Sequence, residues 1–277
     1  MVKKPPSRKQ DRQPIKTLAI DIGGSGIKAI VLDETGTPLT ERGRIATPKP
    51  AIPTAIIKIV TKLAEAQGEF DRVSVGFPGV IRHGIVYTAP NLGNAIWKGF
   101  NLVEALTTQL KKPVRAANDA DVQGFGAIQG KNIELVITLG TGFGSALFVD
   151  GKLVPNLELG HHPFHDCETY EEQLGNKTLE KIGKKKWNKR LAKAIKTLDR
   201  VLNFDHLYIG GGNSKKVNLV LPEKVTLVPN TAGLLGGIAF WNLGPDDLMN
   251  RWIQAKETKK ITAKQRRPGK NAKPSKD

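Results

Sequence analysis

The 277-residue sequence has one cysteine, Cys167, so no disulfide can form within the chain. This scarcity leads us to expect a reducing, cytoplasmic environment. The sequence also lacks any run of eighteen apolar residues, and we therefore expect no membrane-spanning helix. Its basic first sixteen residues contain no apolar segment of the kind that a secretion signal requires.

Aromatic and acidic residues are both scarce, and each scarcity bears on function. Aromatics make up only 6% of the chain, and no base-stacking or groove-reading motif accompanies them, so nucleic-acid binding is the less favoured alternative. Lysine and arginine total 43 against 26 acidic residues, and the net charge is +17. Such an excess points to a polyanionic partner or substrate.

Basic residues are concentrated in three stretches. Residues 1–16 and 259–277 are poor in apolar groups, and we expect both to be disordered tails. Residues 181–196 place apolar side chains four or five positions apart among lysines, which predicts an amphipathic helix with a basic outer face. That face is either a solvated surface or a positive wall beside an anion site.

A glycine-rich hairpin pattern occurs twice in the chain. Apolar runs at 18–22 and 28–32 flank the glycine turn that begins at Gly23, which predicts two strands joined by a tight turn. The pattern returns 117 residues later, where Gly140 takes the place of Gly23. With alternating strand and helix patterns after each hairpin, this repeat predicts a two-lobed α/β fold from an internal duplication, with a central cleft.

Four glycine clusters follow predicted strands or begin predicted helices. They start at Gly23, Gly140, Gly210 and Gly233. Glycine permits a close approach of backbone N–H groups to phosphate oxygens, so four such clusters favour phosphate binding over structural turns alone. None of them fits the P-loop pattern. Lys28 lies beside the first cluster, either as a phosphate contact or as an outward-facing charge.

Polar side chains that suit acid–base chemistry also follow predicted strands. Asn118 and Asp119 come after an apolar strand at 114–117, where the clefts of α/β sheets open. Asp119 is either a general base that accepts a hydroxyl proton or a helix cap. Glu158 and His161 follow the second hairpin and suit a hydroxyl-rich ligand. The spacing of the nearby His and Cys residues fits no closed zinc site.

Five motifs together resemble the sugar kinases of the ROK family, over about residues 17–240. They are DIGGSGIK, VGFPGV, NDAD, LGTGFGSALFVDGKLVPNLELGH and GGGNSK, in the family's order. The first and fourth are most similar to the branch that uses polyphosphate. The resemblance implies an actin-like fold of two ribonuclease-H-like lobes. It also implies transfer of a terminal phosphoryl group from polyphosphate, or alternatively from ATP, to the 6-hydroxyl of glucose.

The resemblance assigns roles to individual positions. Asp119 matches the general base. Asp21 is the candidate to hold Mg²⁺ through water on other grounds, because it lies at the end of the first strand, where Thr138 lies in the second copy of the hairpin. The glucose-binding set consists of Asn91, Asn118, Glu158, His161 and Glu171, with Glu172 as the rival of Glu171. The loops that match the phosphoryl-donor site consist of Gly23, Gly24, Ser25, Gly26, Gly140, Thr141, Gly142, Gly210, Gly211 and Gly212. Lys28 and Lys215 complete the donor set as nearby cations for a polyanionic donor.

The expected organisation combines composition with the resemblance. A homodimer is implied by the family, and no structural zinc is expected because its cysteine-rich zinc site is missing here. Asn213 stands where the polyphosphate-using branch has an apolar residue. The expected parts are a basic tail at 1–16, a first lobe at 17–117, a second lobe at 118–243, a helix at 244–258 packing back on the first lobe, and a basic tail at 259–277.

Overall fold

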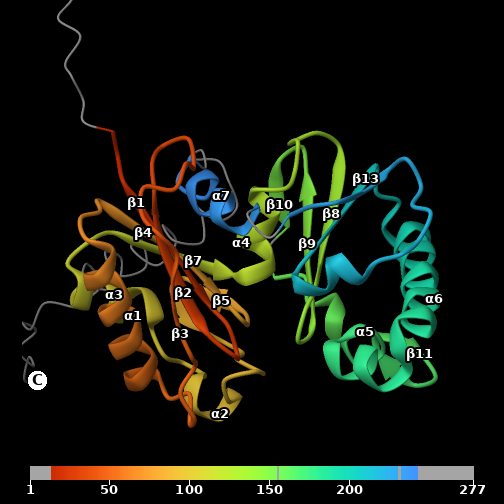
Figure 1. Cartoon of the computed structure of the whole chain (residues 1–277), viewed down its shortest axis with the longest axis horizontal. Coiled ribbons are helices and arrows are strands. Elements are labelled where there is room, and N and C mark those ends of the chain that lie inside the picture. Colours follow the sequence, from red (N-terminus) through yellow and green to blue (C-terminus); the bar gives the residue numbers. More distant parts are fainter. Residues whose placement is uncertain (1–13, 155, 230–231, 243–277) are drawn as a thin grey trace, which may run out of the picture.

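The computed structural model describes residues 14–154, 156–229 and 232–242. These residues form two five-stranded sheets that lie side by side (Figure 1). The first sheet contains β1 (Thr17–Ile22), β2 (Ile27–Leu32), β3 (Gly43–Ile45), β4 (Arg72–Phe77) and β7 (Val114–Asn118). The second contains β8 (Ile133–Leu139), β9 (Phe143–Val149), β10 (Lys152–Val154), β13 (His206–Gly210) and β14 (Val225–Leu227).

The two sheets repeat one topology, which confirms the predicted duplicated α/β fold. Their orders are β3-β2-β1-β4-β7 and β10-β9-β8-β13-β14. In each order the first three strands pair antiparallel and the last three pair parallel. The β1–β2 loop has four residues, 23–26, whereas the β8–β9 loop has three, 140–142. The shift of 117 residues therefore holds for the first strand of each hairpin and becomes 116 for the second.

Helices cover the outer faces of the sheets and fill the space between them (Figure 1). The first sheet carries α1 (Pro53–Gln67) and α3 (Leu102–Leu110), and the second carries α5 (Tyr170–Leu174) and α6 (Asn176–Leu202). Between the sheets, α4 (Asp119–Phe125) packs against α7 (Ala232–Ala239). The shorter elements are α2 (Asn94–Trp97), β5 (Ile81–Arg82), β6 (Ile85–Val86), β11 (Pro163–His165), β12 (Glu168–Thr169) and the 3₁₀ helices η1 (Leu159–His161) and η2 (Gly212–Lys216).

The central strands are buried on both faces. In β1, Leu18 and Ile20 point into the core shared with α1, whereas Ala19 points the other way and meets Ile238 of α7. Strand β8 divides its side chains in the same way between the core with α6 and the core with α4. This alternation follows from the two-residue period of a strand.

Helix α6 contains the basic stretch predicted to be helical at 181–196. It is bent at Gly183, where φ is 76° and ψ is 160°, so the helix there consists of two segments. Trp187 and Leu191 face the core, as the apolar spacing predicts. The charged side chains of the second segment therefore point away from the sheet.

Several predictions on the termini lie outside the described residues. They are the helix at 244–258, the tail at 259–277 and the first part of the N-terminal tail. The lobe boundary after residue 117 stays a prediction. The last described segment returns to the first sheet, where Arg115 donates to the Phe240 carbonyl at 2.7 Å. Within the described ranges, no helix has the length and apolar character needed to cross a membrane.

Candidate active site

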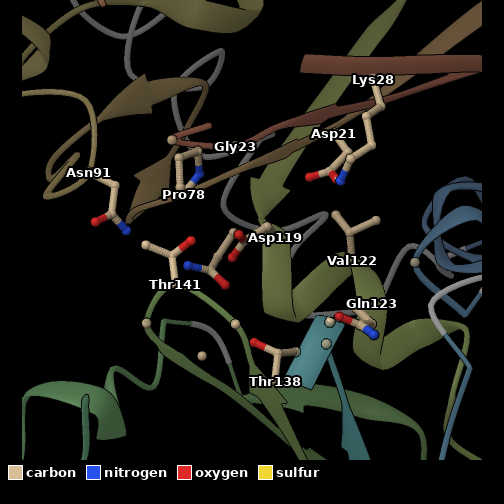
Figure 2. Close-up of a pocket in the computed structure, with 18 of the residues that line it drawn as sticks. Asp21, Gly23, Lys28, Pro78, Asn91, Asp119, Val122, Gln123, Thr138 and Thr141 are labelled. Carbon is tan, nitrogen blue, oxygen red and sulfur yellow. The ribbon is translucent and has the colours of Figure 1, made fainter. Parts of the chain in front are cut away.

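A cleft of about 360 Å³ opens between the two sheets (Figure 2). Its walls are formed by the loops that follow β1, β8 and β13 and by the first turn of α4. Strand ends of the two duplicated halves thus face each other across one space, as expected for a ligand cleft in α/β sheets. The predicted side chains that line it are Asp21, Ser25, Lys28, Asn91, Asn118, Asp119, Thr141, Glu158, His161 and Glu171.

In the first turn of α4, one residue caps the helix and its neighbour is left for acid–base chemistry. Asn118 is the N-cap, and its Oδ1 accepts the N–H groups of Ala120 at 2.8 Å and Asp121 at 3.4 Å. Capping oxygens satisfy helix N–H groups that have no partner within the helix. Because Asn118 does this, the carboxylate of Asp119 is left at the cleft wall, where it accepts one bond from Ala120 at 2.8 Å.

Asp119 is poised to gain or lose a proton near neutral pH. Burial, together with the charges of Asp21 and Glu158, raises the pKa of Asp119 to about 7. A carboxylate with such a pKa can accept a proton from a hydroxyl and release it again without a large energetic penalty. The position and the pKa of Asp119 both fit a general base.

Asp121, two residues after Asp119 on α4, is almost fully buried. It is only 2% exposed, and its Oδ1 has no hydrogen-bond partner among the described residues. The backbone N–H of Asn156 donates to its carboxyl group. Burial raises the pKa of Asp121 well above its ordinary value, and the charges of Glu158 and Asp119 add to this effect. These surroundings favour the neutral acid.

The groups that suit sugar hydroxyls form one polar wall. Asn118 Nδ2 donates to Glu158 Oε1 at 3.3 Å, and His161 Nε2 lies 3.8 Å from Glu158 Oε2. Burial raises the pKa of Glu158, while His161 opposes the shift. Asn91 borders the same cleft near Asp119 (Figure 2). This wall offers amide, carboxylate and imidazole groups within reach of a single small ligand.

The structure separates Glu171 from its rival Glu172. Glu171 lines the cleft, and its Oε2 accepts the N–H of Phe143 at 3.2 Å. Glu172 instead forms a capping box with Thr169 on the exposed side of α5. Gly142 leaves the space for Glu171, because a Cβ added there would lie 2.1 Å from Glu171 Oε2.

All four glycine clusters contribute to the cleft wall, from Gly23 to Gly26, from Gly140 to Gly142, at Gly211 and Gly212, and at Gly233 and Gly237. Gly211 has a φ of 85°, and a Cβ there would lie 2.4 Å from the Leu139 carbonyl oxygen, so only glycine fits.

Two members of the predicted donor set do not line the cleft. Gly210 lies at the end of β13, where a Cβ would meet Gln123 Nε2 at 2.5 Å, and Lys215 is exposed on η2. In the fourth cluster, Gly236 serves helix packing, because a Cβ would lie 1.6 Å from the Val122 carbonyl oxygen of α4.

Asp21 and Lys28 pair with each other across the β1–β2 hairpin. Their strand positions are directly opposite, and Lys28 Nζ lies 2.7 Å from Asp21 Oδ2 (Figure 2). Thr138, the equivalent of Asp21 in the second hairpin, also lines the cleft. The pair places one carboxylate and one ammonium group beside the glycine loops.

The cleft also contains residues that sequence reasoning missed. Arg42 lines it although no motif marks its position. Gln123 lines it as well, and it lies four residues after Asp119 on the same helix. Helical spacing could have identified Gln123, since residues four apart share a face. Pro78, Pro90 and Gly144 also line the cleft.

Comparison with known proteins identifies the family. The model of the ROK family matches residues 17–177. The polyphosphate glucokinase of Mycobacterium tuberculosis (strain CDC 1551 / Oshkosh) is 34% identical over 234 residues, which cover 78% of this chain and 88% of that protein. The structure of the inorganic polyphosphate/ATP-glucomannokinase of Arthrobacter sp. strain KM is 33% identical, with a TM-score of 0.75, over 84% of this chain and 100% of that one.

A more distant structure shares the fold. The ROK family glucokinase of Streptomyces griseus is 20% identical, with a TM-score of 0.66, over 81% of this chain and 98% of that one. The two similar sheets with a cleft between them are thus the actin-like fold of ROK sugar kinases. The matched family model, the extent of the identity and the shared fold agree: the chain belongs to the ROK family.

Proposed function

We propose that this protein is a glucose kinase that transfers the terminal phosphoryl group of inorganic polyphosphate to the 6-hydroxyl of glucose. The observation that carries the proposal is Asp119, whose carboxyl group has a pKa of about 7 and shares one cleft with hydroxyl-binding groups and glycine loops. Family membership and the polyphosphate glucokinase relatives support the same substrates.

In the proposed reaction, the predicted glucose-binding set holds the sugar hydroxyls. Asp119 accepts the proton of the 6-hydroxyl as its oxygen attacks the terminal phosphorus. The bond between that phosphorus and the bridging oxygen breaks, and the shortened polyphosphate leaves with the electron pair. Backbone N–H groups of the glycine loops stabilise charge on the phosphoryl oxygens.

The choice of polyphosphate as donor follows from its chemistry. Polyphosphate has no base, so its recognition requires cations along a chain of phosphates. The net charge of +17 suits such a donor. ATP is the second candidate donor, because the similar Arthrobacter enzyme is named for both polyphosphate and ATP.

We propose Mg²⁺ as the cofactor, with Asp21 as the residue that holds it. Among the described residues no group of three or more His, Cys, Asp or Glu is arranged to hold a metal. Mg²⁺ fits this setting, because it keeps several waters and is bound through one or two carboxylates together with substrate phosphates. When bound, it neutralises charge on the phosphates. Lys28, now 2.7 Å from Asp21, would then turn to the donor.

We further propose that the protein works as a homodimer in the cytoplasm. The dimer is inferred from the family alone. The cytoplasmic setting is supported by the single cysteine, Cys167, which is an exposed free thiol. The expected lack of structural zinc stays a prediction.

The test supplies glucose and Mg²⁺ with either nucleotide-free polyphosphate or ATP and measures glucose 6-phosphate. The proposal predicts product with polyphosphate. Product with ATP alone would rule out the polyphosphate donor, and product with neither would rule out the kinase. The Asp119→Asn variant, assayed in parallel, controls for contaminating kinases.

A further inference from the structure

One exposed face of α6 carries only positive charge. After the bend at Gly183, five basic side chains recur three or four residues apart: Lys185, Lys189, Lys193, Lys196 and Arg200. We call these five residues the α6 basic face. They are exposed, and they lie opposite the buried side of the helix, which covers the outer face of the second sheet (Figure 1).

The charges of the α6 basic face are not compensated. Within the described part of the chain, none of the five pairs with a carboxylate. Asp199, the one acid in this segment of the helix, is held by Lys224 at 2.6 Å. Like charges at this spacing repel each other and destabilise a helix. A bound polyanion would relieve that repulsion and release counterions.

Helix α6 is attached to the donor side of the cleft. The N–H of Asn176, its first residue, donates to the carbonyl groups of Gly140 at 3.0 Å and Thr141 at 3.4 Å. Asn213 Nδ2 donates to the Gly140 carbonyl and to Asn176 Oδ1, each at 3.2 Å. The unusual Asn213 thus ties the glycine loops to the start of α6.

Further cations connect the cleft with the α6 basic face. Lys177 and Lys181 are exposed on the first segment of α6. Lys216 lies on η2, which is joined to α6 because Asn188 Nδ2 donates to the Lys216 carbonyl at 3.1 Å. A flexible polyanion that leaves the cleft past Thr141 therefore meets positive charge in the direction of the basic face.

We propose that the α6 basic face binds the distal part of a long polyphosphate chain whose terminal phosphate lies in the cleft. This inference rests on the proposed function. The five cations span about 22 Å along the helix axis, because each helical residue adds about 1.5 Å. A chain of three phosphates that occupies the cleft is too short to reach across this span, so the face distinguishes long donors from short ones.

Long polyphosphate fits this face better than a nucleic acid does. Binding of single-stranded nucleic acid uses exposed aromatic side chains on which bases stack. The one aromatic residue of α6 is Trp187, which is fully buried and donates to the Leu174 carbonyl at 2.9 Å. The face therefore offers contacts to phosphate groups and none to bases.

The test compares two double variants with the wild-type protein. Lys189→Gln/Lys193→Gln removes two neighbouring charges of the α6 basic face. Lys58→Gln/Lys62→Gln is the matched control, because these lysines are also exposed and four residues apart, on α1 of the other sheet. Each protein is assayed with long-chain polyphosphate and with tripolyphosphate, at several salt concentrations and saturating glucose.

The face variant is expected to show a higher KM for long-chain polyphosphate. The slope of log KM against log salt should fall by about 1.5, since each lost phosphate contact removes about 0.7–0.9. Its KM for tripolyphosphate and its kcat should stay unchanged, as should all values of the control variant. Unchanged helical circular dichroism would show that the fold is intact.

Three results would overturn the inference. If the wild-type protein uses both donors and the face variant keeps the wild-type KM and salt slope, the face does not bind polyphosphate. If DNA binding, measured in parallel, weakens in the face variant while its KM for long polyphosphate stays that of the wild type, the face serves a nucleic acid. If the wild-type protein uses neither donor, the proposed function itself fails, and the inference fails with it.

Discussion

Replacing Asp119 with asparagine is expected to stop catalysis and to stabilise the folded protein above neutral pH. The side chain lies at the cleft wall in the first turn of α4, and its pKa is raised from 3.8 to about 7. The folded protein keeps this proton up to a higher pH than the unfolded chain does. The stability that it contributes is complete below about pH 4 and is lost as the pH rises to about 7.

The magnitude follows from the size of the pKa shift. About three pKa units, at 1.36 kcal/mol each, correspond to at most about 4 kcal/mol, and water that reaches the carboxylate through the cleft reduces this value. Asparagine does not ionise, so the variant does not lose this stability as the pH rises. The free energy of unfolding of the variant, relative to wild type, should rise by up to about 3 kcal/mol between pH 5 and pH 8. Loss of the general base should lower kcat by about 10²–10⁴-fold.

Urea unfolding at pH 5 and pH 8 measures the stability difference, and the formation of glucose 6-phosphate measures kcat. Glu223→Gln serves as the control, because Glu223 is an exposed carboxylate that does not line the cleft. The same stability difference at both pH values would refute the argument from burial. Substantial remaining turnover would refute the assignment of Asp119 as the base.

Three further substitutions test other parts of the site. Gly142→Ala should raise the KM for glucose several-fold, because the new methyl group would lie 2.1 Å from Glu171 Oε2 and displace that carboxylate. Glu172→Ala should leave this KM unchanged and lower the free energy of unfolding, because it removes half of a capping box. Asp21→Asn should lower the pKa of Asp119 in the Mg²⁺-free protein, measured by NMR titration of its carboxyl carbon, because the charge of Asp21 raises that pKa.

Each of these predictions has its own control and contrary result. Gly140→Ala changes the same loop with nothing within 4 Å of the new methyl group, so an equal rise in glucose KM would contradict the steric argument. Thr169→Ala should match Glu172→Ala in stability, and a change in glucose KM in either variant would place the capping box in the site. An unchanged pKa of Asp119 in Mg²⁺-free Asp21→Asn would show that this charge does not act on Asp119.

Much of the architecture could be predicted because its signals are local. The apolar runs around Gly23 and Gly140 predicted two hairpins. The structure contains each hairpin in one of two sheets of identical topology. The one-residue difference between the hairpin loops became visible only from the strand register. Aligning the two copies of the sequence at a fixed offset cannot show that one loop has an extra residue. Residues such as Arg42 were missed, since they reach the cleft from segments without a recognisable pattern.

By itself, the sequence determined the strand and helix pattern, the duplication, the basic character of α6 and the family motifs. Each of these depends on spacing along the chain. The tertiary structure decided which of two adjacent residues faces the cleft and which one caps a helix. Asn118 caps α4 while Asp119 faces the cleft, and Glu171 faces the cleft while Glu172 caps α5. The raised pKa of Asp119 was decided there as well, because burial and the nearness of other charges arise from segments far apart in the chain, and no local pattern contains them.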